Sequence, residues 1–302
     1  MNELANIHSW ENHIELFIEN LDRKPATKQA YHKALKEWVR FYETEPKAPN
    51  VHLVLQYKRY LVLRALSPYT ISLYLTALRG MFDFLVNLKR IPFNPANSIR
   101  GIKKPQSKRD ALTRDEVLRL LNLPYDDTEE SARNRAVLCL KLFTGLRDIS
   151  IVGVNVRDMQ IKCGRVLLYY QSKGHETKSE FVILEPKVKS VIDEYLTKRG
   201  SVNRDDPLFV SCSDRNYGQR LTTQSIRLII RSLFTQAHVT RDEISPHSLR
   251  HTAITFAVLG GADITAARAM ASHRSIETTA GYFHDIERLD NPAESYISKY
   301  LH

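Results

Sequence analysis

Four amphipathic segments fill the first hundred residues of this 302-residue chain, and their apolar spacing restricts what this part can fold into. In each segment apolar side chains recur every three to four residues, which is the period of a helix with one buried face. The segments are 7–20, 27–44, 51–64 and 67–86. The last one opens on Ser67-Pro68, a pair that suits an N-cap and a first helical turn. Since each helix has one apolar face to bury, we predict that residues 1–101 form a single helical bundle.

A short polar stretch follows the bundle. Residues 102–110 are basic and contain one proline, so we predict a linker between two domains. In 111–302 helical patterns accompany two strand-like segments, 165–171 and 179–184, and the polar turn between them predicts a hairpin. We therefore expect a mainly α fold with a small antiparallel β-sheet, in which the N-terminal bundle precedes a mixed α/β domain.

Local signals place several helices in the second domain. Thr113 and Glu116 have the spacing of a capping box, and an apolar helix is expected over 133–146. Ser245 is a good N-cap residue, and Pro246 suits the first helical position after it. The remaining helical patterns cover 187–198, 223–237, 246–259 and 264–271.

The last amphipathic segment, 291–301, begins at Asn291-Pro292, another pair that suits a helix start. An isolated helix of about ten residues is unstable in water, so its apolar face must dock on something. The docking partner is either its own domain or a neighbouring subunit.

The net charge of +10 favours a polyanionic partner, and most of it lies in residues 1–105, which carry +7. No apolar run is long enough to span a membrane, and the N-terminus lacks the pattern of a signal peptide, so we expect an intracellular protein. Three widely spaced cysteines argue against a disulfide framework or a structural zinc site. Because no nucleotide-binding loop or metal-ligand motif occurs, we expect no cofactor.

Two short motifs place single cations at turns. In the run Thr-Gly-Leu-Arg at 144–147, the glycine permits a tight bend and delivers Arg147 at a helix end. Lys173 lies at the expected hairpin tip, and Lys178 is a competing candidate five residues on. Taken alone, each of these cations is better explained as a solvated surface residue.

Two histidines, an arginine and a tyrosine follow. His247 and Arg250 are three apart near a predicted helix N-terminus, where both can point at one anion. His251 is expected to point elsewhere and to be structural. His273 comes next, and Tyr282 lies nine residues beyond it.

The ordered set resembles the signature of the tyrosine recombinase/integrase family. It comprises Arg147, Lys173, His247, Arg250, His273 and Tyr282. The likeness extends over the whole chain: 1–101, with 67–85 and Asn-Pro-Ala at 94–96, is similar to the family's core-binding domain, and 111–302 to its catalytic domain.

This resemblance implies an Xer-like or Cre-like site-specific recombinase. Such an enzyme cleaves and rejoins DNA through a 3′-phosphotyrosine intermediate, without a metal or a high-energy cofactor. In that comparison Tyr282 is the nucleophile and Lys173 protonates the departing 5′-oxygen. The residues that match positions for binding the phosphate or assisting proton transfer are Arg147, Arg250, His273 and His247.

The resemblance also implies partners and a location. We expect double-stranded DNA with an inverted-repeat site, a homotetramer joined through the 291–301 tail, and an accessory protein or second recombinase as a further candidate. The expected location is the cytoplasm, at the nucleoid. Contacts to the DNA backbone are expected from Lys103, Lys104, Lys108 and Arg79. A type IB topoisomerase-like nicking enzyme and a catalytically silent DNA-binding relative are the alternatives.

One position departs from the family pattern. The family usually has an acidic residue three positions after the first arginine, whereas this chain has Ser150 there and an acid at Asp148. Two interpretations of Asp148 remain open: it supports a catalytic group from a different angle, or it is a plain surface acid.

Overall fold

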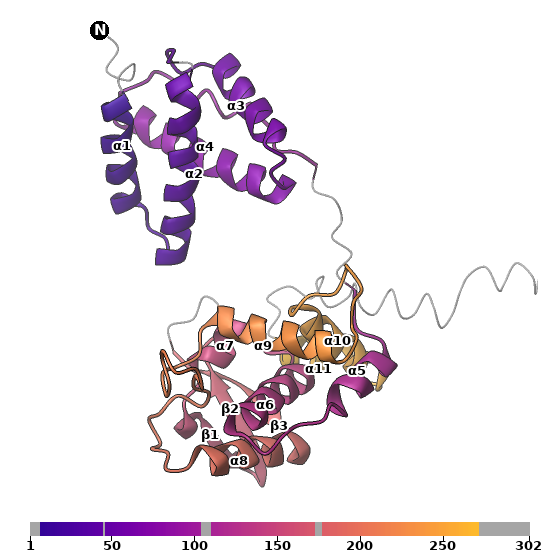
Figure 1. The fold of residues 1–302 in the computed structure, drawn as a ribbon. Helices are drawn as coiled ribbons and strands as arrows, with labels where there is room; N and C mark the ends of the chain where they lie inside the picture. The colour runs from indigo at the N-terminus through magenta and orange to yellow at the C-terminus, as the bar shows by residue number, and fades with distance from the viewer. Residues whose placement is uncertain (1–6, 45, 104–109, 173–176, 272–302) are drawn as a thin grey trace, which may run out of the picture. The chain divides into compact units, whose positions relative to one another are not determined.

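The computed structural model describes residues 7–44, 46–103, 110–172 and 177–271. The chain divides into two compact units, Met1–Ser107 and Lys108–His302. Each unit has its own hydrophobic core, and Figure 1 shows the helices and strands of the two units. In the described ranges, no helix is long and apolar enough to cross a membrane.

The apolar spacing of the first hundred residues predicts its helices correctly. They are α1 (Ile7–Asn20), α2 (Pro25–Thr44), α3 (Val51–Leu63) and α4 (Pro68–Asn87). The Ser67 side chain accepts a hydrogen bond from the Thr70 amide at 3.1 Å, which confirms the predicted N-cap. Aromatic rings fill the core, where the Trp38 ring centroid lies 5.0 Å from that of Tyr57 and 5.7 Å from that of Trp10.

The chain after α4 folds back onto that helix through one buried amide. Asn94 Nδ2 donates to the Asp83 carboxylate at 2.7 Å and to the Arg79 carbonyl at 2.9 Å. Ile102, expected in the linker, packs against the same core. The first unit therefore includes the segment that follows its last helix.

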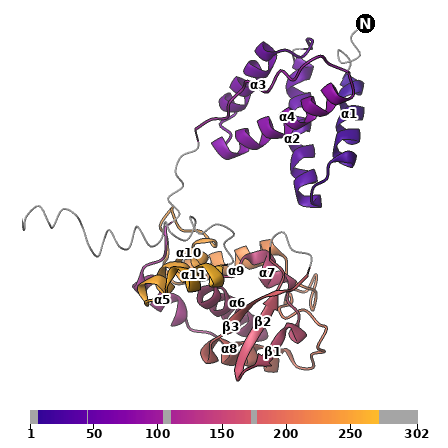
Figure 2. The same cartoon turned by 180° about the vertical axis from the view of Figure 1, so that it is seen from behind.

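The second unit is built around α6, which is buried from residue 136 to residue 142. Helices α8, α9 and α10 and strand β3 all contact α6 (Figures 1 and 2). Its helices are α5 (Arg114–Leu121), α6 (Glu129–Thr144), α7 (Asp148–Gly153), α8 (Pro186–Arg199), α9 (Thr223–Gln236), α10 (Ser248–Leu259) and α11 (Ile264–Ala271). The capping box of Thr113 and Glu116 is present at the start of α5.

The sheet has three antiparallel strands in the order β1-β2-β3. They are β1 (Met159–Lys162), β2 (Arg165–Tyr170) and β3 (Glu180–Leu184). The predicted hairpin is the β2–β3 pair, with Leu167 opposite Ile183. Strand β1 was not predicted, because its four residues are too few for a clear period. The strand has no buried face, and its Ile161 is 79% exposed.

Two helix starts differ from the prediction. Helix α6 begins at Glu129 because the Thr128 side chain accepts from the Ser131 amide at 3.1 Å, a capping signal upstream of the apolar run. Helix α10 begins at Ser248, so the prediction of Ser245 as its N-cap was wrong. There the Ser248 amide donates to the Ser245 carbonyl at 2.7 Å, a tight i to i+3 turn that precedes the helix.

Candidate active site

The turn between α6 and α7 fixes the backbone of Arg147. Helix α6 ends at Thr144, and Gly145 follows with a φ of +64°, the left-handed conformation that favours glycine. Arg147 is the N-cap of α7, and its carbonyl accepts from the amides of Ser150 (2.9 Å) and Ile151 (3.1 Å). Among the described residues, the half-buried Arg147 guanidinium makes no hydrogen bond or ion pair.

Arg250 of α10 reaches this same turn. Its side chain is 4% exposed, and its two Nη atoms donate to the carbonyls of Gly145 and Ala271. A Cβ at position 145 would lie 3.4 Å from that of Ala253, so α10 approaches the turn closely. The structure therefore brings Arg147 and Arg250 to one turn. Through its bond to the Ala271 carbonyl, Arg250 also holds the last residue of α11. Ala271 lies two residues before His273 in the sequence.

The two histidines of the His-Ser-Leu-Arg-His run lie together at the start of α10. The ring centroids of His247 and His251 are 5.2 Å apart, with an angle of 80° between the rings. The expectation that His251 points elsewhere was wrong, because residues four apart share a helix face. That spacing was the signal in the sequence.

Ser150 and Asp148 tie α7 to three different elements. Ser150 Oγ donates to the Gln171 carbonyl at 3.1 Å, just beyond the end of β2. One Asp148 oxygen pairs with the ammonium of Lys141, and the other accepts from Arg227 Nε at 3.2 Å. The Asp148 side chain is only 11% exposed, so the interpretation as a plain surface acid was wrong.

Lys141 is a functional candidate that the sequence reasoning missed. It stands inside the apolar run of α6 and is fully buried. Burial lowers the pKa of its ammonium, and the carboxylate of Asp148 offsets part of that shift. The positive charges of Arg250 and Arg227 lower the same pKa further. A charged residue within an otherwise apolar helix was the available signal.

The base of the β2–β3 hairpin is held by hydrogen bonds. Glu180 accepts from the Tyr170 hydroxyl at 3.1 Å and from Ser172 Oγ at 2.8 Å. The Lys178 ammonium pairs with Asp158, a carboxylate that is 10% exposed. Lys178 therefore already has a structural partner.

Three of the predicted catalytic residues lie outside the described residues. These are Lys173, His273 and Tyr282. The described part of the site comprises Arg147, Arg250 and His247, together with the residues that hold them.

The comparison with known protein families decides the chain's membership. A model described as the phage integrase family matches residues 110–288, more than half of the chain. This chain belongs to that family. Relatives of this chain are tyrosine recombinases. The chain is 31% identical over 301 residues to the tyrosine recombinase XerC of Pelobacter propionicus, covering 95% of this chain and 93% of that protein. It is 33% identical over 233 residues to the tyrosine recombinase XerD of Oceanobacillus iheyensis, covering 75% of each.

Solved structures share the recombinase fold. The XerH site-specific recombinase in a post-cleavage complex with palindromic difH substrate gives a TM-score of 0.72 at 19% identity, covering 96% of this chain and 85% of that one. A lambda integrase dimer bound to a COC′ core site gives 0.69 at 18% identity, covering 89% and 95%. The predicted fold class is confirmed by these likenesses, which are likenesses of fold.

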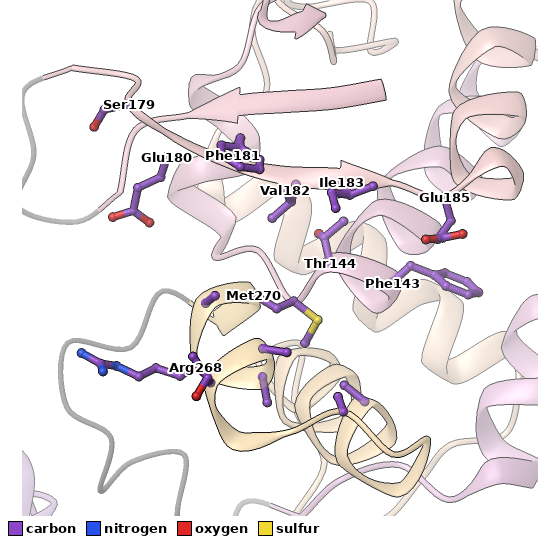
Figure 3. Close-up of a pocket in the computed structure, with 16 residues that line it drawn as sticks. Phe143, Thr144, Ser179, Glu180, Phe181, Val182, Ile183, Glu185, Arg268 and Met270 are labelled. Atoms are coloured by element: carbon purple, nitrogen blue, oxygen red, sulfur yellow. The ribbon is translucent and has the colours of Figure 1, made fainter. Parts of the chain in front are cut away.

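An apolar groove of about 850 Å³ lies between β3 and α11 of this recombinase (Figure 3). Phe181 and Ile183 of β3 line it, with Phe143 of α6 and Met270 of α11. Figure 3 shows Met270 directed between the helix and the strand. The groove is therefore an apolar surface beside the end of the last described helix.

In the first unit, the DNA-contact candidates differ in their surroundings. Arg79 Nη2 donates to the Ile99 carbonyl at 3.0 Å, so this guanidinium supports the segment after α4. Lys103 is exposed, whereas Lys104 and Lys108 lie outside the described residues. Of the recombinase's four candidates, Lys103 and Arg79 alone can be judged on structure.

Proposed function

We propose that this recombinase is site-specific and cleaves and rejoins DNA strands through a 3′-phosphotyrosine intermediate. The observation that carries the proposal is the meeting of two arginines at one turn: Arg250 donates to the Gly145 carbonyl, two residues from Arg147. Two guanidinium groups held this way suit the non-bridging oxygens of a single phosphate, whose charge grows in the transition state.

Each predicted catalytic side chain has its own role in the reaction. The Tyr282 phenol oxygen attacks phosphorus, the phosphotyrosine bond forms, and the bond to the 5′-oxygen breaks. Lys173 gives its proton to that oxygen, while the phenol proton passes to His247. His273 hydrogen-bonds the phosphate. Attack by a 5′-hydroxyl of the partner strand reverses the step and restores the tyrosine. Since the phosphotyrosine keeps the bond energy, the proposed reaction needs no high-energy cofactor.

Arg250 can take part in this chemistry while it holds the turn. Its two Nη atoms each donate to a backbone carbonyl, and a guanidinium carries five N–H donors, so these two bonds do not exclude a bond to phosphate. A charge-assisted bond to phosphate is stronger than a bond to a neutral acceptor. We therefore propose that the Gly145 turn lies next to the bound phosphate.

The nucleophile can be tested with the full chain and a pool of nicked duplexes of random sequence. The wild type should give a protein–DNA adduct that survives a denaturing gel, and Tyr282→Phe should give none. Tyr217→Phe is the control, because Tyr217 is an exposed tyrosine of the same unit. An adduct with Tyr282→Phe would contradict the assignment, and sequencing the trapped duplexes would define the site.

The general acid can be tested with a 5′-phosphorothiolate duplex, whose sulfur leaves without protonation. It should restore cleavage by Lys173→Ala. Lys178→Ala should need no restoration, because its ammonium is bound by Asp158. Restoration of Lys178→Ala alone would reverse the assignment.

The relatives and the groove support a proposal for the partners. Two structural relatives are bound to recombination sites, one of them palindromic, so we propose double-stranded DNA with inverted repeats as the substrate. We further propose a tetramer in which segment 291–301 occupies the β3–α11 groove of a neighbouring subunit. Both an apolar tail face and an apolar groove need covering, which supports this pairing.

The assembly can be tested by removing either side of the contact. Deletion of 291–302 and the groove variant Phe181→Ser should each weaken assembly on a full site more than binding to one half-site. Phe181 is 49% exposed, so the fold should tolerate the change. Ile161→Ser, on the exposed strand β1, is the control. Equal losses on full and half sites would favour docking within one subunit.

A further inference from the structure

The pairing of Asp148 with two cations has a geometric consequence for Arg147. Asp148 is the first residue of α7, directly after Arg147. Its carboxylate binds Lys141 of α6 and Arg227 of α9. One side chain thus joins the start of α7 to two other helices, and Figure 1 shows α7 and α9 side by side. We name Asp148, Lys141 and Arg227 the Asp148 clamp.

Stability alone is a poor reason for this clamp. The Lys141 side chain is fully buried, and desolvation lowers the pKa of its ammonium. Its neighbours in α6, Leu140 and Leu142, are buried apolar residues. Replacing a buried ion pair by apolar residues of similar volume is often neutral or stabilising, so a methionine would serve the core at least as well.

Hydrogen bonds between charged groups fix the relative position of two side chains more tightly than apolar contacts do. Among the described residues the Arg147 guanidinium has no hydrogen-bond or ion-pair partner, so the position of its backbone has a large share in where it points. A catalytic group misplaced by about 1 Å can lose roughly 100-fold in rate. Hydrogen-bonded charges fix distance and angle, whereas a methionine in the same space fixes neither.

We propose that Asp148, Lys141 and Arg227 are positioning residues that hold Arg147 in place for the scissile phosphate. The Lys141 carbonyl accepts from the Gly145 amide at 3.0 Å, and Arg250 donates to the Gly145 carbonyl, so the clamp adjoins both arginines of the site. The inference rests on the proposed role of Arg147. It names no contact between the clamp and DNA: the three residues act through the backbone at the start of α7.

Two variants separate positioning from stability. Lys141→Met leaves a buried carboxylate and should lower both the melting temperature and the cleavage rate. Lys141→Met with Asp148→Asn removes both buried charges, so the melting temperature should recover. The single-turnover rate at saturating DNA, measured where every variant is folded, should stay about 10- to 100-fold below wild type. Lys189→Met is the control, because Lys189 forms an exposed ion pair with Asp193 within α8.

Amide hydrogen exchange tests the positioning role without measuring DNA cleavage. The amides of Ser150 and Ile151 donate to the Arg147 carbonyl, so their hydrogen exchange reports the hold on that residue. Exchange should be at least tenfold faster in the double variant than in wild type. Recovery of both rate and exchange with the melting temperature would overturn the inference and leave a purely structural pair. Failure of the wild type to form an adduct would overturn the proposed function, while the exchange data would still decide the clamp.

Discussion

Replacing Gly145 by alanine tests how far the turn between α6 and α7 organises the site. Gly145 has a φ of +64°, and an L-residue in that conformation costs about 1–2 kcal/mol. The added Cβ would meet Ala253 at 3.4 Å, an ordinary contact, so no steric overlap adds to the cost. For a unit of this size, 1 kcal/mol lowers the melting temperature by roughly 2–4 °C. We expect a total decrease of roughly 2–8 °C.

The same substitution should reduce catalysis, because the Gly145 carbonyl accepts from Arg250. Any rotation of that peptide to relieve the positive φ moves the acceptor away from the guanidinium. The measurement is the rate of covalent adduct formation by folded protein at saturating DNA, alongside thermal unfolding followed by circular dichroism. Both quantities should fall together.

Gly153→Ala is the matched control. Gly153 lies in α7 with no positive φ, and a Cβ there would meet no atom within 4 Å. Alanine should be neutral or slightly stabilising at that position, by about 0.5–1 kcal/mol. If Gly145→Ala unfolds at the wild-type temperature, or if both variants lose the same stability, the argument from the left-handed turn is refuted.

Three further predictions concern charged side chains. The hydrogen bonds of Arg241 hold the pKa of Glu116 below its ordinary 4.5, so their stabilisation is present above that pH and is lost as the pH falls through the lower, folded-state pKa. Above about pH 5 the free energy of unfolding of wild type should therefore exceed that of Glu116→Gln by about 1–2 kcal/mol, since the guanidinium is one-third exposed. The melting temperature of wild type should be higher accordingly, and the difference should shrink in acid. A constant difference from pH 7 to 3 would count against this. Arg79→Ala should destabilise the first unit by about 1 kcal/mol through its lost bond to the Ile99 carbonyl. Lys103→Ala should leave stability unchanged and reduce the salt dependence of DNA binding by about one counterion, and an unaltered salt slope would exclude a phosphate contact there.

Periodic apolar patterns and local capping residues predicted several elements correctly. The four helices of the first unit, the capping box at Thr113 and the β2–β3 hairpin all depend on residues close in sequence. Such signals are local because a helix or a tight hairpin satisfies its own backbone hydrogen bonds. The family likewise followed from short motifs in a fixed order, since each motif keeps its chemistry within a few residues.

The wrong predictions had two causes. Some local signals were missed: strand β1 has only four residues and pairs with β2 across a short turn, and a turn from Ser245 to Ser248 precedes α10. In the other case, residues distant in sequence decide. Asp148 looked like either a supporting or a surface acid, because its partners stand seven residues before it and 79 residues after it.

The sequence by itself determined the mainly helical class, the small hairpin and the residue types that the proposed chemistry needs, because propensity, period and capping act over a few residues. Only the tertiary structure decided which side chains meet. It brought Arg250 to the turn that carries Arg147, and it buried Lys141 against Asp148. Those contacts join α6, α7, α9 and α10, and their geometry depends on packing across the whole unit, which no local pattern encodes.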